Sequence, residues 1–214
     1  MRRYSVAEEV AHATTHGVGL LLSVVALVVL VWFATLHGDL WHIVSVSIYG
    51  ATLVLLYTAS TLYHSIPHPR AKQVLQSIDH ASIYLLIAGT YTPVTLTTLR
   101  GGWGFTLFGI VWGLALVGVL LEAFAKKRLR VVSLVLYLGL GWLAAVAVKP
   151  LFERVPLGGL ALLLAGGLAY TAGVGFYVWR KLPYHHAVWH VFVLIGSVCH
   201  FFAVLLYVIP RPRA

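Results

Sequence analysis

The chain has 214 residues, of which 60% are hydrophobic and only 10% are charged, and its formal net charge at pH 7 is +9. A soluble domain of this length has no interior large enough to bury so many apolar side chains, so a water-soluble globular protein is excluded. The basic residues are expected at membrane surfaces, and no nucleic-acid partner is predicted from them.

Seven apolar runs follow one another along the chain, each near the roughly 20 residues that a membrane-spanning helix needs. In chain order they are Gly17–Leu36, Ile43–Tyr63, Ile78–Leu99, Trp103–Leu121, Val131–Val148, Leu157–Trp179 and Ala187–Ile209. The runs are continuous rather than alternating, so they predict helices and not the strands of a membrane barrel. Because the connections are short, residues 1–214 are predicted to form a single all-α domain, a seven-transmembrane helix bundle.

The orientation is predicted from the connections, since Lys and Arg concentrate on the cytoplasmic side of short loops. Ten of the 15 Lys and Arg residues fall on the side of the N-terminus: Arg2, Arg3, Arg70, Lys72, Lys126, Lys127, Arg128, Arg130, Arg180 and Lys181. The other five fall on the opposite side: Arg100, Lys149, Arg154, Arg211 and Arg213. We therefore predict a multi-pass protein of the cell membrane with its N-terminus inside and its C-terminus outside. Residues 126–130 are expected to contact anionic lipid headgroups.

Polar residues from distant parts of the sequence fall at the cytoplasmic ends of the predicted helices. His64 closes the second run, Asp79 opens the third, and His186 and His190 begin the seventh. Seven crossings put all four at the same membrane depth. Ionisable side chains are costly in hydrocarbon, so their collection at one depth indicates a functional site.

Three of these residues have the spacing and chemistry of a metal site. His186 and His190 are four positions apart, so both imidazoles leave one face of a helix, and His64 supplies a third nitrogen. Three histidines and a water molecule are the ligands of a catalytic zinc, whereas a structural zinc is usually closed by four protein ligands. Asp79 would balance the charge and accept a proton from the water. Ser60, one turn before His64, would orient a ligand, bond the water or contact a substrate carbonyl.

Simpler roles are open for the other histidines. We interpret five of them as interfacial or hydrogen-bonded histidines that bind no metal: His12, His37, His42, His68 and His185. His80, beside Asp79, is interpreted as structural. His200 lies about 15 Å deeper than His190 along the predicted helix and therefore cannot share its ion.

Glu9 and His16 are seven residues apart, on one face at the inner start of the first helix. Two roles are open for them. In the first, Glu9 caps the helix and interacts with its dipole, and His16 lies at the membrane interface. In the second, both residues support the metal ligands without binding the ion themselves.

Taken together, the motifs resemble the hemolysin III family, the bacterial branch of the progestin and adipoQ receptor superfamily. The resemblance is carried by Glu9–His16 within Ala-Glu-Glu-Val-Ala-x-Ala-x-Thr-His-Gly, by Ser60-Thr-Leu-Tyr-His64, by Asp79–Pro93 and by His186-Ala-Val-Trp-His190. It implies seven helices with an inside N-terminus and zinc bound by His64, His186 and His190. It also implies that Asp79 and Ser60 lie at the metal's water or just behind it. One position departs from the family, which commonly has Asn where this chain has His12.

The family resemblance leaves more than one function open. Its eukaryotic branch implies zinc-dependent hydrolysis of a ceramide-like lipid amide or ester, with membrane lipid as the substrate. Its name implies a cytolytic pore, and other bacterial members imply a sensor of membrane fluidity in which zinc is structural. Hydrolysis is the favoured hypothesis, because no charged row lines any predicted helix as a pore would require.

Overall fold

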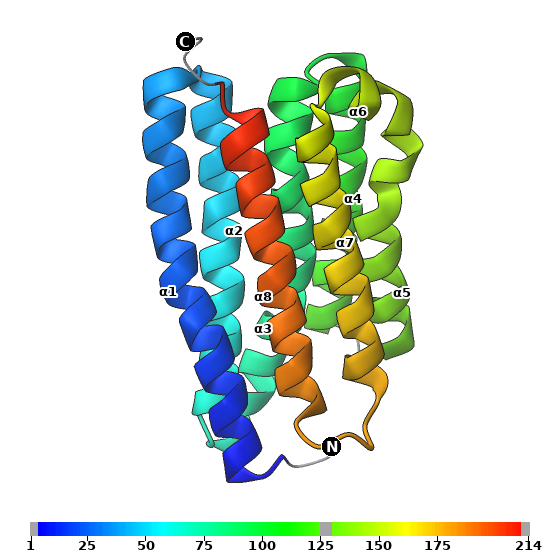
Figure 1. Cartoon of the computed structure of the whole chain (residues 1–214). Coiled ribbons are helices and arrows are strands. Elements are labelled where there is room, and N and C mark those ends of the chain that lie inside the picture. Colours follow the sequence, from blue (N-terminus) through cyan, green and yellow to red (C-terminus); the bar gives the residue numbers. More distant parts are fainter. Residues whose placement is uncertain (1–3, 125–129, 211–214) are drawn as a thin grey trace.

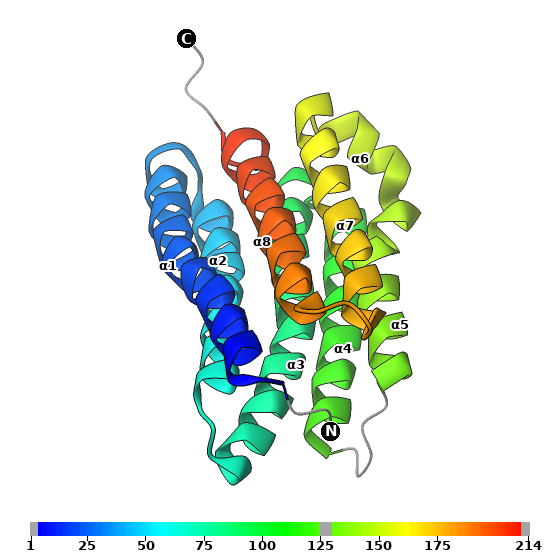
Figure 2. The same cartoon turned by 60° about the horizontal axis from the view of Figure 1, so that its bottom comes forward.

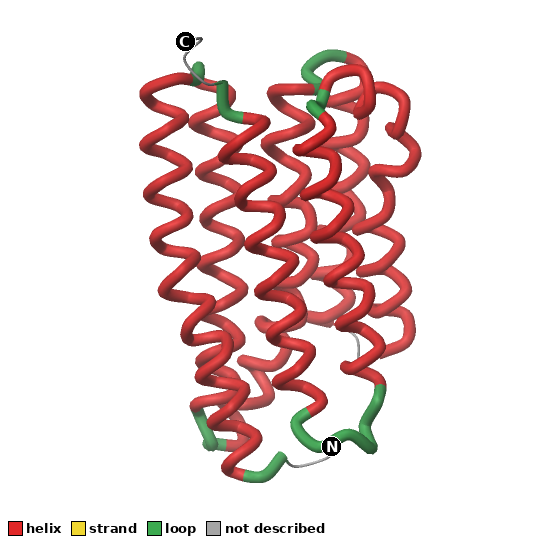
Figure 3. The backbone as a smooth tube through the Cα atoms, viewed as in Figure 1, coloured by secondary structure: helices red, strands yellow, loops and turns green. Residues whose placement is uncertain are grey.

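A computed structural model describes residues 4–124 and 130–210 of the chain. Within these residues every regular element is helical and no strand is present (Figure 3). The helices stand side by side in an elongated bundle (Figure 1). Their order is α1 Val6–His37, α2 Leu40–Ser65, α3 Pro69–Pro93, η1 Val94–Thr98, α4 Gly102–Phe124, α5 Arg130–Gly141, η2 Trp142–Ala147, α6 Val148–Arg154, α7 Leu157–Val178, α8 His185–Ala203 and η3 Val204–Val208.

Six described helical segments are long and apolar enough to cross a membrane. They are Val6–His37, Leu40–Ser65, Gly102–Phe124, Val131–Arg154, Leu157–Val178 and His185–Val208. α3 has a comparable length of 25 residues, but its first half carries polar side chains. Two of these, Gln76 and Asp79, are buried inside the bundle rather than turned outward. α3 is therefore the seventh long helix in the described part of the chain, and the predicted number is confirmed.

The outward faces of the helices are apolar. On α1 alone, Leu21, Val25, Val28 and Trp32 are all exposed large hydrophobic side chains. Such a continuous apolar exterior is unstable in water and suits the hydrocarbon of a bilayer.

α1 begins well before the apolar run that predicted it, at Val6 rather than Gly17. Ser5 and Glu8 form a capping box: the backbone N–H of Glu8 donates to Ser5 Oγ at 3.2 Å, and the backbone N–H of Ser5 donates to Glu8 Oε2 at 2.8 Å. Capping satisfies the free amides of the first turn, so the helix starts in a polar stretch that hydropathy alone does not register.

α3 likewise begins earlier than predicted, at Pro69 rather than Ile78. A proline in the first turn costs no hydrogen bond because amides there have no helical partner. Pro93 ends α3, and a π-helical turn, η1, carries the chain onward to Thr98.

The predicted fifth helix, Val131–Val148, is divided in the structure into α5, the 3₁₀ turn η2 and the short α6. Tyr91 of α3 meets the backbone where the helix changes. Its hydroxyl donates to the carbonyl oxygen of Gly141 at 2.7 Å and accepts from the N–H of Ala144 at 2.9 Å. The tyrosine thus bonds backbone groups near the junction, where the helical hydrogen-bond pattern changes.

Two apolar cores hold the bundle together. One includes Leu30, Leu53 and Val204, from α1, α2 and the segment that follows α8. The other includes Val111 and Leu140, from α4 and α5, packed against α3. Figure 2 shows α8 lying between α1 and α7.

The first described turn of α1 and the last turn of η3 lie at opposite ends of the bundle (Figure 1). Which end faces the cytoplasm stays a prediction. Much of the basic charge behind that prediction lies outside the described residues: Arg2, Arg3, Lys126, Lys127, Arg128, Arg211, Arg213 and the side chain of Arg130.

Candidate metal centre

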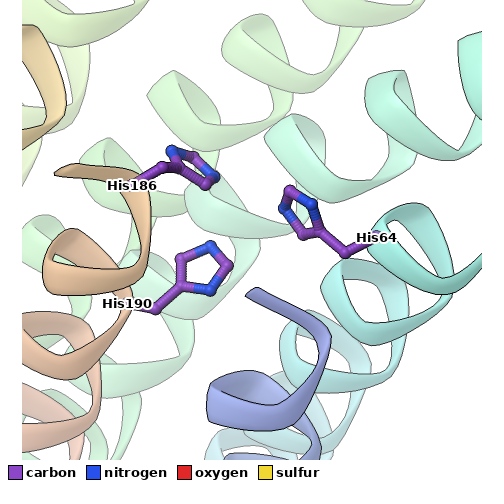
Figure 4. A group of neighbouring side chains, drawn as sticks. All are labelled: His64, His186 and His190. Atoms are coloured by element: carbon purple, nitrogen blue, oxygen red, sulfur yellow. The ribbon is translucent and has the colours of Figure 1, made fainter. Parts of the chain in front are cut away.

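The last turn of α2 and the first turns of α8 face each other near the end of the bundle where α1 starts. They bring His64 together with His186 and His190, as the close-up shows (Figure 4). One nitrogen of each ring lies within 4.8 Å of the others. All three residues are buried, with at most 8% of their surface exposed. The ligand role assigned to them from the sequence stays a prediction, but the three side chains do meet.

The start of α8 sets the position of two of these rings. Tyr184, the residue before the helix, has a φ of 54°, a left-handed conformation uncommon outside glycine. The chain reverses there, and α8 begins immediately, so that His186 and His190 lie one turn apart and point inward. Their ring centres are 4.5 Å apart.

Hydrogen bonds from outside the cluster orient two of the rings. His64 Nδ1 lies 2.6 Å from Glu9 Oε2, and His190 Nδ1 lies 3.2 Å from the carbonyl oxygen of His12. An Nδ1–H that donates outward leaves Nε2 with a free lone pair, which is the form that binds a metal. His64 Nε2 is buried and has no hydrogen-bond partner among the described residues.

Glu9 links the site to α3. Its second oxygen, Oε1, lies 2.7 Å from the ammonium nitrogen of Lys72. The carboxylate therefore joins α1 to both α2 and α3. The capping box is made by Glu8 and not by Glu9, so the contacts of Glu9 match the supporting role rather than the cap.

His16 packs against the cluster as well. Its ring is stacked on that of His190, with centres 3.5 Å apart and planes 13° from parallel, and meets Tyr57 edge-on at 5.1 Å. Neither of its nitrogens has a hydrogen-bond partner among the described residues. A supporting role for Glu9 and His16 is consistent with these contacts and stays a prediction.

His12 is not exposed at an interface, and its Nδ1 lies 3.8 Å from Glu9 Oε2, so the interfacial part of its interpretation is wrong and its role stays a prediction. Its side chain is fully buried, and neither ring nitrogen has a hydrogen-bond partner among the described residues. The sequence did carry a signal: Glu9, His12 and His16 recur at spacings of three and four, so they share one helical face. The sequence interpretation placed Glu9 and His16 on that face but did not include His12 with them.

The other histidines fit the simpler roles better. His42 bonds Asp39 at 2.7 Å, and His68 caps α3 by accepting from Ala71 N. His37 packs on Phe33, and His185 is buried with Nδ1 3.2 Å from the carbonyl oxygen of Phe176. His200 Nε2 lies 3.1 Å from the carbonyl oxygen of Leu163, in another part of the bundle.

A cavity of about 150 Å³ lies beside the histidines, and His186, His190, Ser60 and Asp79 all line it. Ser60 is buried, and its hydroxyl has no hydrogen-bond partner among the described residues. Asp79 is 8% exposed and interacts electrostatically with His64. The two residues predicted to take part in catalysis thus face the same space as two of the predicted ligands.

The lining of this cavity also includes a polar group that the sequence interpretation missed. His80 Nδ1 lies 3.6 Å from Glu122 Oε2, and Ser133 Oγ donates to Glu122 Oε1 at 2.6 Å. All three residues line the cavity, together with Tyr137. A glutamate directly after an apolar run was the available signal for Glu122, although its partners depend on how α3, α4 and α5 pack.

The histidine cluster fits a transition-metal ion. Nitrogen donors from neutral histidines suit zinc and similar divalent metals, and a buried imidazole nitrogen without a partner is costly unless something binds it. His64 Nε2 and His186 Nδ1 are both in that position. Neighbouring carboxylates, Glu9 and Asp79, supply the negative charge that a cation needs in a low-dielectric interior.

Comparison with known proteins finds relatives along almost the whole chain. The family profile described as Haemolysin-III related matches residues 4–201. The chain is 50% identical over 209 residues to the hemolysin-3 homolog of Bacillus subtilis (strain 168), which covers 98% of each protein. It is 49% identical over 205 residues to hemolysin-3 of Bacillus cereus, covering 96% of this chain and 94% of that protein. It is 28% identical over 213 residues to the human monocyte to macrophage differentiation factor, covering 96% of this chain and 86% of that protein.

Proposed function

The chain belongs to the haemolysin-III related family of membrane proteins, and we propose that it is a zinc-dependent hydrolase acting on a lipid amide or ester. One observation carries this proposal: three buried histidines converge beside a cavity that Asp79 and Ser60 also line. In the proposal, the whole chain acts as one seven-helix unit of the plasma membrane, with the histidine end toward the cytoplasm.

His64, His186 and His190 would hold the ion. When bound, zinc supplies Lewis acidity, which polarises an acyl carbonyl and favours deprotonation of water. A three-nitrogen set without thiolates is typical of catalytic rather than structural zinc.

The chain's own groups carry the remaining steps. Asp79 is the general base, taking a proton from the attacking water and returning it to the leaving amine or alcohol. The hydroxyl of Ser60 donates a hydrogen bond to the carbonyl oxygen, where negative charge develops. The apolar part of the cavity, lined by Leu86, Val174 and Val193 among others, holds the acyl chain and keeps bulk water out.

The test is fatty-acid release by the purified protein in detergent. The substrates are a long-chain N-acyl ethanolamine and an ester with the same acyl chain, and zinc content is measured on the same samples. We expect wild type to release fatty acid, Asp79→Asn to keep zinc and lose release, and His190→Ala to lose both. Zinc-loaded wild-type protein that cleaves neither lipid would overturn hydrolysis of these amide and ester classes.

A non-enzymatic function is the second candidate, and the position of His12 favours it. Its ring contacts those of all three predicted ligands, and a further imidazole at this place suits a closed, structural site that ties α1, α2 and α8 together, in a pore or a sensor of membrane fluidity. Lysis is suggested by the name of the Bacillus cereus relative. Dye release from vesicles by the same preparation, without lipid cleavage, would favour this alternative.

A further inference from the structure

His12 occupies a place that neither the family motifs nor the proposed mechanism uses. It comes from α1, whereas the three predicted ligands come from α2 and α8. Its ring centre lies 4.7 Å from that of His64, 4.8 Å from that of His186 and 5.5 Å from that of His190. It is therefore in ring contact with all three at once.

The four rings are arranged almost symmetrically. The remaining three separations are 5.2 Å for His64 and His186, 5.1 Å for His64 and His190, and 4.5 Å for His186 and His190. All six separations thus fall between 4.5 and 5.5 Å. Four points at nearly equal mutual distances lie at the corners of a tetrahedron.

A tetrahedral zinc site predicts nearly this spacing. A zinc–nitrogen bond of about 2.0 Å puts the centre of an imidazole ring about 3.2 Å from the ion, and tetrahedral directions then separate ring centres by about 5 Å. Packing alone gives no reason for four imidazoles to adopt this arrangement, because buried polar rings normally find hydrogen-bond partners. His12 has none at either nitrogen among the described residues.

We propose that His12 is a fourth nitrogen ligand, so that in this chain four histidines from α1, α2 and α8 close the metal site. The inference rests on the metal site of the proposed function, and not on hydrolysis. If the site works as a hydrolase, water and substrate reach it by displacing His12 or by a fifth coordination position.

A separate second ion between Glu9, His12 and His64 is the competing arrangement, since these donor atoms lie within 4.8 Å of one another, whereas no nitrogen of His12 is grouped with those of His186 and His190. In the proposed site the His12 ring is turned over, which exchanges its nitrogen and carbon positions and keeps its centre in place. The contacts of Glu9 are evidence against this second ion. Oε2 is already bonded to His64 and Oε1 to the Lys72 ammonium, at 2.6 and 2.7 Å. A second cation would displace that ammonium or be repelled by it.

The test compares the metal spectra of wild type, His12→Asn and the control His37→Asn, each loaded with cobalt(II) in place of zinc. Asparagine is a weaker donor of similar polarity, and His37 lies at the far end of the same helix. We expect wild type and the control to give the visible spectrum of a tetrahedral four-nitrogen site that azide changes much less than it changes the spectrum of His12→Asn. In His12→Asn we expect a shifted spectrum that responds to azide, and an affinity lower by roughly 10- to 100-fold.

X-ray absorption of the zinc-loaded wild type provides a measurement that needs no variant to fold. Four imidazoles per ion support the proposal, and three overturn it. Identical spectra and azide responses in wild type and His12→Asn also overturn it, while leaving a three-histidine site and the proposed hydrolysis intact. Failure of the wild type to bind any metal would instead overturn the metal site itself.

Discussion

Two groups, each made of a histidine, a carboxylate and a basic residue, occur at opposite ends of the bundle, and their histidine–carboxylate distances are nearly the same. Near the start of α1, His64 Nδ1 lies 2.6 Å from Glu9, which pairs with Lys72 at 2.7 Å. Beyond the end of α1, His42 Nδ1 lies 2.7 Å from Asp39, which is 3.8 Å from Arg100.

Depth and connectivity separate these two groups. The His64 side chain is fully buried and joins residues 55 positions apart, whereas Asp39 is 54% exposed and its bond to His42 spans three positions. The exposed group is a helix cap, worth little because water screens it. The buried group holds a ring whose other nitrogen faces the cluster. Similar residues thus cap a helix where they are exposed, and join distant helices and orient a buried imidazole inside the bundle.

The largest effect is expected when a predicted ligand is removed. His190→Ala should reduce bound zinc to background, because the loss of one buried nitrogen ligand leaves the ion incompletely coordinated and opens a cavity beside it. Metal content of purified protein measures this. His42→Ala, at the opposite end of the bundle, is the matched control and should keep its zinc. Equal zinc content in the two variants would contradict a ligand role for His190.

Removing the proposed general base is expected to have the next largest effect. Asp79→Asn keeps the size and polarity of the side chain but cannot accept the proton, so fatty-acid release should fall by roughly 10²- to 10⁴-fold with zinc retained. The control is Asp39→Asn, which should leave release unchanged. A slow rate in the control would show that carboxylate loss acts through folding.

Glu9→Gln should have a smaller effect on the metal. The amide cannot hold the imidazole of His64 as an anionic carboxylate does, so zinc affinity should fall by roughly 10- to 100-fold. Competition with a chelator measures this fall. If Glu9 only tethers Lys72, the variant will melt at a lower temperature with its zinc affinity unchanged.

The smallest effect is expected at the exposed group. Asp39 caps α2 by accepting from the N–H of His42, and this hydrogen bond lowers the pKa of Asp39. Asp39→Ala should reduce the melting temperature by roughly 2–4 °C at pH 7. Because the pKa of Asp39 is lowered in the folded protein, its carboxylate stabilises the fold at pH values above the ordinary pKa of aspartate. The difference in melting temperature between wild type and Asp39→Ala should therefore shrink as the pH falls through the lowered pKa of Asp39. A difference that grows on acidification would contradict this account of the cap.

The arrangement of the helices was largely predictable, since hydropathy located seven segments. The starts of α1 at Val6 and of α3 at Pro69 were not predictable from hydropathy, because they are set by a capping box and by a proline in the first turn. This matters at the site, because His12 was interpreted as interfacial, whereas it is buried with its ring in contact with those of His64 and His186.

The site was predictable where spacing along a helix decides it. His186 and His190 share a face by periodicity, and counting seven crossings places His64 and Asp79 at their depth. The contact between Glu122 and His80 could not be anticipated, because it depends on the rotation of α4 against α3. Side-chain rotation about a helix axis is set by tertiary packing rather than by local sequence.

Anomalous X-ray scattering at the zinc absorption edge, from crystals of the purified protein, tests the central claim most directly. The account predicts one strong peak between the end of α2 and the start of α8, within bonding distance of His64, His186 and His190. A zinc-containing protein whose peak lies elsewhere, with these three rings pointing apart, would contradict it.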